Sequence, residues 1–238
     1  MRLDDFDYEL PPEQIAQTPV EPRDSARLLV DRGADDPLHR HVRDLVEFLD
    51  HGDLLVVNDT RVLPARLQLR RSTGGAAEVL MLEPLDGTRT TWESLIRPAK
   101  RIKRREVLLT AAGVPAVEVG ERTEAGETFV VRLVGSGDSL EILDDLGEMP
   151  LPPYITARLA DPDRYQTVYA REPGSAAAPT AGLHFTDDLL DRLAADGVDI
   201  ARVELVVGLD TFRPITEDLS LIHISEPTRP SKSSRMPS

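Results

Sequence analysis

The sequence predicts an α/β (α+β) fold: an α/β main domain that carries an inserted small antiparallel β-barrel domain. Three observations indicate this. Near the C-terminal end, an amphipathic helix pattern leads directly into a strand pattern, and an apolar run at Leu54 to Val57 resembles a buried strand. Between them lies a long stretch of short alternating apolar runs separated by glycine turns. We expect the main domain at residues 1–65 and 149–218 and the barrel at residues 66–148.

The first part of the chain has both strand and helix patterns. Arg27 to Val30 predicts a strand. A stripe at i, i+3, i+4 and i+7 predicts a short helix that stops near Gly52, and it consists of Val42, Leu45, Val46 and Leu49.

The run Leu54 to Val57 has no polar alternation, which is typical of a strand buried on both faces. The polar residues Asn58 to Arg61 follow it, so we expect a loop at the carboxyl end of that strand. Ligands commonly bind at this end in α/β sheets. A plain turn without a ligand is the alternative, because Asn and Asp side chains hydrogen-bond their own backbone in turns.

The predicted barrel has five apolar runs with glycine-containing turns between them. These runs are Leu67–Leu69, Glu78–Leu82, Trp92–Ile96, Val107–Leu109 and Phe129–Val134. Trp92 is expected in the core. The proline-rich segment from Met149 to Ile155 should be extended and return the chain to the main domain.

A loop of small residues, Gly174 to Thr186, lies immediately before the predicted helix and contains His184. Thr186 is a hydroxyl N-cap, and Gly197 is suited to the position after the helix end. The apolar face consists of Leu189, Leu190, Leu193 and Ala194, and Val198 to Val207 follows as a strand.

Backbone N–H groups at such a helix start suit a carboxylate or phosphate, and small residues let a ligand approach the backbone. The alternative is a tight loop with a structural histidine. A Ser–His hydrolase built on Ser175 and His184 is disfavoured, because the sequence has no GxSxG elbow.

Composition excludes several classes of protein. The chain has 238 residues, no cysteine and five scattered histidines, so disulfides, thiol nucleophiles and a metal site have little support. No apolar run approaches the ~18 residues of a membrane span, and no signal peptide is visible, so we expect a cytoplasmic protein. The net charge of −14 argues against indiscriminate nucleic-acid binding but not against a local basic patch.

One basic cluster contains no acidic residue: Arg97, Lys100, Arg101, Lys103, Arg104 and Arg105. On sequence grounds alone, a solvated charge run on a hairpin is the favoured interpretation.

Several long stretches resemble the S-adenosylmethionine:tRNA ribosyltransferase-isomerase family of the queuosine pathway, in the order in which that family has them. They are Asp5–Pro11, Ile15–Gln17, Arg23–Leu29, Gly52–Arg66, Leu151–Ile155, Tyr165–Tyr169 and Ala178–Thr186. The resemblance implies the same two-domain fold. It also implies transfer and isomerisation of the ribosyl part of S-adenosylmethionine onto 7-aminomethyl-7-deazaguanine in a tRNA anticodon, with release of adenine and methionine. S-adenosylmethionine is then a substrate, and no cofactor is expected.

This chemistry needs a base beside the sulfonium, an acid near the departing adenine and a cleft that positions two large substrates. We assign catalytic roles to His184, Asp59 and Arg61. Substrate contacts are assigned to Asn58, Thr60, Tyr154, Tyr165, Gln166, Tyr169, Thr180, Gly182, Thr186, Gly208 and Thr211. The resemblance also favours tRNA contact by the basic cluster. We expect no metal, no membrane partner and a monomer. A catalytically inactive RNA- or nucleotide-binding fragment of the same fold is the alternative.

The resemblance stops at about Leu219. Residues 219–238 resemble a translated adaptor or other non-native sequence, rich in serine and proline. We therefore expect a C-terminally truncated chain with a foreign, disordered tail, and poor solubility or inactivity as a result.

Overall fold

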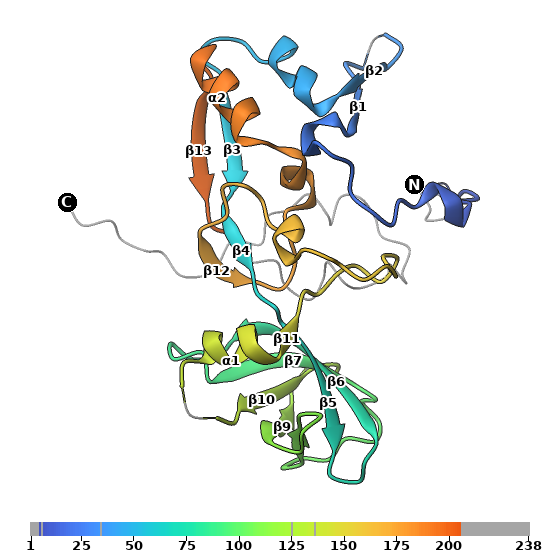
Figure 1. The fold of residues 1–238 in the computed structure, drawn as a ribbon, viewed down its shortest axis with the longest axis vertical. Helices are drawn as coiled ribbons and strands as arrows, with labels where there is room; N and C mark the ends of the chain where they lie inside the picture. Colours follow the sequence, from blue (N-terminus) through green and yellow to red (C-terminus); the bar gives the residue numbers. More distant parts are fainter. Residues whose placement is uncertain (1–4, 6, 34, 125, 136, 206–238) are drawn as a thin grey trace, which may run out of the picture.

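The computed structural model has an α/β body above a β-barrel (Figure 1). The chain passes from the body into the barrel between residues 62 and 66, and it returns to the body after residue 148. The structure describes residues 5, 7–33, 35–124, 126–135 and 137–205. Both parallel and antiparallel sheets are present, so the mixed α/β fold class is confirmed. Among the described residues, no helix combines the length and apolar character needed to cross a membrane.

The α/β body begins with short elements. After the 3₁₀ helices η2 (Pro12–Gln14) and η3 (Arg23–Ser25), β1 (Arg27–Val30) pairs antiparallel with β2 (Leu38–His41). The predicted helix at Val42 is present as the 3₁₀ helix η4 (Val42–Glu47). The chain re-enters this body after the barrel through η5 (Pro162–Tyr165), β12 (Glu172–Ser175) and η6 (Thr180–His184). It then forms α2 (Asp187–Ala195) and β13 (Asp199–Val203).

Two parallel strand pairs organise this body. β3 (Leu54–Asn58) pairs with β13, and β4 (Thr60–Val62) pairs with β12. Only Asp59 separates β3 from β4, so the polar loop that we expected at residues 58–61 is wrong. The Asp59 N–H donates to the Val203 carbonyl at 3.1 Å, and its carbonyl accepts from the Arg171 N–H at 2.8 Å. These bonds to β13 and to the residue before β12 keep the polar residues extended.

The expectation that β3 is buried on both faces is also wrong. Leu54 and Val56 are 60% and 55% exposed, whereas Val57 is 5% exposed. On the opposite face, Leu55 packs with Leu189 of α2 and with residues of η4. Among the described residues the sheet is therefore covered on one side.

Six antiparallel strands form a closed barrel. They are β5 (Arg66–Arg71), β6 (Ala76–Pro84), β7 (Thr91–Arg97), β8 (Val107–Leu109), β9 (Pro115–Arg122) and β10 (Phe129–Leu133). They follow the order β5-β6-β7-β10-β9-β8, and pairing of β8 with β5 closes the sheet. The closing pairs join Arg70 and Arg71 of β5 to Leu109 and Leu108 of β8, so β5 is paired on both of its edges there. Trp92 is 1% exposed in the barrel core, as expected.

Two elements of this part were not expected. β9 was not predicted, and neither was α1 (Ser139–Leu146), whose N-cap Asp138 accepts a hydrogen bond from the Leu140 N–H at 2.8 Å. The chain leaves the barrel through β11 (Gly147–Glu148), which pairs with the start of β5. Domain boundaries at residues 65/66 and 148/149 stay a prediction.

Candidate functional site

A cavity of about 460 Å³ lies where three distant segments of the α/β body meet. The N-terminal segment contributes Gln17 and Glu21, and the segment around η5 contributes Tyr154 and Tyr165. Thr180 and His184 come from η6. Four residues that we assigned from the sequence therefore share one cavity: Tyr154, Tyr165, Thr180 and His184.

His184 is the last residue of η6 and is partly exposed. Its Nδ1 lies 3.1 Å from the Ala181 carbonyl oxygen. In a neutral imidazole with the proton on Nδ1, this contact is a donated hydrogen bond, and Nε2 is the proton acceptor. This local bond thus selects the tautomer that could accept a proton from a ligand.

Tyr165, the last residue of η5, and Tyr169, which follows η5, have different surroundings. Burial raises the pKa of the Tyr165 hydroxyl, although a hydrogen bond with the Ala178 backbone opposes the shift. Tyr169 does not line the cavity: its ring packs edge-on against Phe185, with centroids 6.4 Å apart. Burial also raises the pKa of Tyr169. At neutral pH both hydroxyls keep their protons.

Gly182 and Thr186 have structural contacts around the same loop. Gly182 is buried beneath the Tyr169 hydroxyl. The Thr186 hydroxyl accepts a hydrogen bond from the Leu189 N–H at 3.2 Å, so it caps α2 as the sequence predicts.

The residues of β3 and β4 lie outside the lining of this cavity. The Asp59 carboxylate is buried and accepts hydrogen bonds from Nη2 and Nε of Arg171, at 2.6 and 2.9 Å. Arg61 lies 3.8 Å from Asp163 at the surface. The catalytic roles assigned to Asp59 and Arg61 therefore require a ligand to approach these ion pairs.

Asn58, Thr60 and Gln166 hold backbone segments. The Asn58 amide exchanges two hydrogen bonds with the backbone of Leu205, and the Thr60 hydroxyl lies within 3.2 Å of the Leu205 N–H. The Gln166 side chain makes the same two-bond exchange with Val62, at 2.9 and 2.8 Å. These amides join segments that are distant in sequence.

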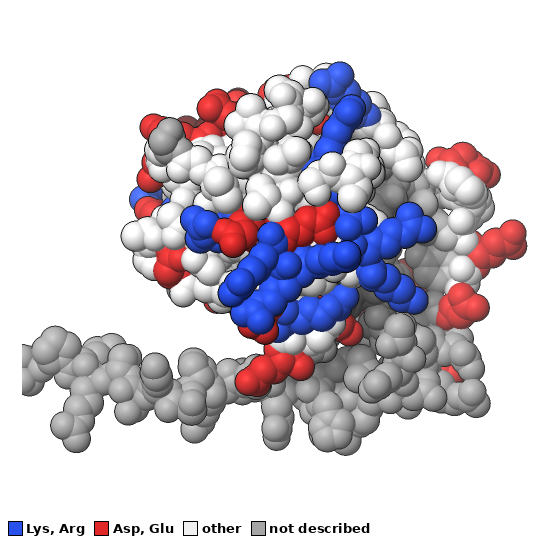
Figure 2. All heavy atoms as spheres, turned by 90° about the horizontal axis from the view of Figure 1, so that it is seen from below, with Lys and Arg blue, Asp and Glu red and all other residues white. Residues whose placement is uncertain are grey.

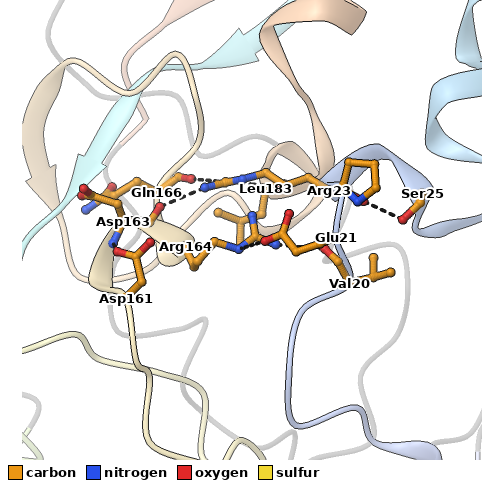
Figure 3. A network of polar contacts seen from close by, with 10 residues as sticks. Val20, Glu21, Arg23, Ser25, Asp161, Asp163, Arg164, Gln166 and Leu183 are labelled. Atoms are coloured by element: carbon orange, nitrogen blue, oxygen red, sulfur yellow. Dashed lines mark hydrogen bonds and ion pairs between the residues drawn. The ribbon is translucent and has the colours of Figure 1, made fainter.

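The sequence assignments missed the polar network beside the cavity, which contains Glu21, Arg23 and Arg164 (Figure 3). The Arg164 Nε lies 2.8 Å from a Glu21 carboxylate oxygen, and its Nη2 donates to the Val20 carbonyl at 3.0 Å. Gln17 holds the segment that carries Tyr154, because its Nε2 donates to the Tyr154 carbonyl at 2.9 Å. Gln17 and Arg23 belong to stretches whose resemblance to the family was visible, which was the signal that could have identified them.

The basic cluster lies at the far end of the barrel, where Lys and Arg side chains gather on one face (Figure 2). It occupies the end of β7 and the connection to β8. Arg104 pairs with Glu121 at 2.6 Å, and Arg97 lies 4.0 Å from Glu78. Lys100, Arg101, Lys103 and Arg105 are exposed.

Gly208 and Thr211, together with the predicted foreign tail, lie outside the described residues. Within the described part of the chain, no group of three or more His, Asp or Glu side chains is arranged to hold a metal ion.

Comparisons with known proteins cover most of the chain. The family model described as "Queuosine biosynthesis protein" matches residues 3–227. The S-adenosylmethionine:tRNA ribosyltransferase-isomerase of Staphylococcus epidermidis is 53% identical over 218 residues, which are 91% of this chain and 63% of that protein. The protein of the same name from Symbiobacterium thermophilum is 55% identical over 90% of this chain and 63% of its own length.

A crystal structure of S-adenosylmethionine tRNA ribosyltransferase from Thermotoga maritima is 33% identical to this chain. The match covers 85% of this chain and 58% of the other, with a TM-score of 0.34. The chain thus spans less than two thirds of the length of the curated relatives reported above.

Proposed function

Because this chain belongs to the queuosine biosynthesis protein family, we propose that it acts as an S-adenosylmethionine:tRNA ribosyltransferase-isomerase. In this proposal it transfers and isomerises the ribosyl moiety of S-adenosylmethionine onto 7-aminomethyl-7-deazaguanine in a tRNA anticodon. The product is epoxyqueuosine, and adenine and methionine are released. The observation that carries the proposal is 53% identity over 91% of the chain to a protein of that name.

The cavity bounded by Tyr154, Tyr165 and His184 is the proposed site for S-adenosylmethionine. Its volume of about 460 Å³ falls within the ~300–1,000 Å³ of ordinary small-molecule sites. Tyr154 is 56% exposed at the cavity wall, where its ring could stack on a purine. The Glu21 carboxylate also lines the cavity, where it is paired with Arg164 at 2.8 Å.

His184 is the proposed proton-transfer group. An imidazole exchanges a proton near neutral pH, and the Nδ1 contact with the Ala181 carbonyl directs Nε2 to act as the acceptor. Two proton transfers are needed: a base removes a proton from the carbon beside the sulfonium, and an acid delivers one to the departing adenine. We assign His184 to one of them.

The basic cluster at the barrel end is the proposed contact for the tRNA backbone. Lys100, Arg101, Lys103 and Arg105 are exposed on a face where Lys and Arg side chains gather, with acidic side chains beside them (Figure 2). Phosphate contacts of this kind position a nucleic acid without reading its sequence. In this proposal the protein is cytoplasmic and monomeric, and S-adenosylmethionine is consumed as a substrate.

Adenine release tests the activity directly. We expect the chain to release adenine from S-adenosylmethionine only when tRNA carrying 7-aminomethyl-7-deazaguanine is present. A tRNA with unmodified guanine at that position is the control. Binding of both substrates without adenine release would instead identify an inactive RNA- or nucleotide-binding module.

A further inference from the structure

The Arg23 guanidinium connects two 3₁₀ helices, η5 and η6, whose residues line the cavity (Figure 3). Its Nη1 donates to the Gln166 carbonyl at 2.6 Å and to the Leu183 carbonyl at 3.4 Å. Its Nη2 donates to the Asp163 carbonyl at 3.0 Å. One side chain thus binds carbonyl groups at the ends of both η5 and η6.

The Gln166 and Leu183 carbonyls need such a donor. The last carbonyl groups of a helix have no partner within the helix, and they carry partial negative charge. Gln166 is the C-cap residue of η5, and Leu183 lies in the last turn of η6. Each lies next to a residue of the cavity lining, Tyr165 in one case and His184 in the other.

The geometry requires a guanidinium. Arginine has five N–H donors in a fixed plane, so it can bind several carbonyls whose directions converge. A lysine ammonium is a compact point charge and cannot span the three oxygens in the same way. Burial is the largest influence on the Arg23 pKa and lowers it, and the nearby Arg164 lowers it further. Partial burial limits competition from water for these bonds.

We propose that Arg23 is a positioning residue that fixes the positions of Tyr165 and His184 relative to each other in the lining of the ligand cavity. It acts through the η5 and η6 backbones and does not need to touch the ligand. This inference rests on the proposed function in one respect, namely that the cavity takes S-adenosylmethionine.

The first measurement is independent of any ligand. In Arg23→Ala we expect at least about tenfold faster hydrogen exchange at the Gln166 and Gly182 amides, which bond within η5 and η6 at 3.1 and 2.8 Å. The Val119 amide, which bonds to Glu106 in the barrel at 2.9 Å, should keep its exchange rate. Unchanged exchange at Gln166 and Gly182 would overturn the inference.

The second measurement is the Kd for S-adenosylmethionine by calorimetry, at a temperature where circular dichroism shows each variant folded. We expect Arg23→Ala and Arg23→Lys both to weaken binding about tenfold, the change that corresponds to ~1.4 kcal/mol. Free guanidinium ion at millimolar concentration should restore part of the affinity of Arg23→Ala. Arg23→Lys keeps the charge and provides the result if the alanine variant does not fold. Wild-type affinity in the lysine variant would overturn the requirement for a guanidinium.

Arg71→Ala is the matched control. Arg71 also makes two guanidinium hydrogen bonds, to Glu106 at 2.7 and 3.0 Å, but at the far end of β5. The Arg71→Ala substitution should lower the melting temperature without changing the Kd for S-adenosylmethionine. An equal loss of affinity in Arg71→Ala would show a general stability effect and overturn the positioning role. If the wild-type chain does not bind S-adenosylmethionine, the proposed function fails, and the exchange measurement alone decides the role of Arg23.

Discussion

Gly182 lies directly against the hydroxyl of Tyr169, so closely that a Cβ at position 182 would overlap the phenolic oxygen. The same Cβ would come within 3.1 Å of the Thr167 side chain. The loop therefore approaches a buried tyrosine to a distance that no other residue type permits. This packing holds η6, and with it His184, against the η5 side of the α/β body.

We expect Gly182→Ala to lower the melting temperature by several degrees, because the buried Tyr169 ring must move. Removing the hydroxyl in Gly182→Ala/Tyr169→Phe should recover part of the loss. Gly87→Ala is the control, since a Cβ at Gly87 meets nothing within 4 Å. Thermal unfolding of the four proteins checks this prediction, and equal melting temperatures for Gly182→Ala and wild type would contradict it.

His184→Ala should lower turnover with little effect on folding. The His184 ring is partly exposed and makes one weakly constraining contact with the Ala181 carbonyl, so its removal leaves no large cavity. Adenine release and thermal unfolding are the two measurements. The exposed His39, changed to alanine, is the control. Full activity of His184→Ala would show that the proton-transfer assignment is wrong, and a drop of several degrees in melting temperature would indicate a structural role.

Charge reversal at Lys100, Arg101 and Lys103 should weaken tRNA binding and flatten its dependence on salt concentration. Each phosphate contact that is lost removes roughly one unit from the slope of log K against log salt, because fewer counterions are released. Affinity for S-adenosylmethionine should stay the same. Filter binding between ~50 and 200 mM salt measures the slope.

A matched triple variant controls for net charge. It reverses the charges of three exposed residues of the α/β body, Arg27, Arg43 and Arg192. If this variant flattens the slope as much as the first, the effect comes from overall charge and not from the barrel-end surface.

Asp86 should make the stability of the barrel depend on pH in the acid range. Its carboxylate accepts hydrogen bonds from Thr88, through both its hydroxyl and its backbone N–H, from the hydroxyl and N–H of Thr90, and from the Thr91 N–H. These bonds, with that of Thr88 the largest influence, hold the Asp86 pKa far below its usual value. Because the pKa is lower in the folded state, the ionised Asp86 stabilises the folded protein above the unfolded pKa of 3.8. This stabilisation is lost progressively as the pH falls below 3.8. Asp86→Asn should therefore be less stable than wild type at pH 7, and the difference should shrink below about pH 4. A constant difference across urea titrations at pH 3 to 7 would contradict this.

Adjacent valines of β3 should respond differently to the same substitution. Val56→Thr places a hydroxyl at a position that is 55% exposed, so we expect unchanged stability and improved solubility. Val57→Thr buries that hydroxyl at a position that is 5% exposed, and we expect a loss of about 1–3 kcal/mol. Urea denaturation compares the pair, and equal stabilities would show that β3 is not covered on one face only.

Local patterns in the sequence determined the type of several elements. The Thr186 cap and the apolar stripe at Leu189 and Leu193 define α2, because capping and side-chain periodicity act within one or two helical turns. The strand at Arg27 to Val30 is present at the expected residues. Alternating runs likewise indicated five of the six barrel strands, and Trp92 was correctly expected in the core.

Only the tertiary structure decided how distant segments pair. Propensity alone predicts a loop for Asn58–Arg61, but bonds from Asp59 to β13 and to Arg171 keep these residues extended. Tyr165 and His184 were expected to act in one site, but their placement beside Gln17 and Glu21 depends on Arg23, which bonds across 143 residues to Gln166. Local composition cannot encode such pairings, because their free energy arises only when the whole chain brings a buried donor and its acceptor together.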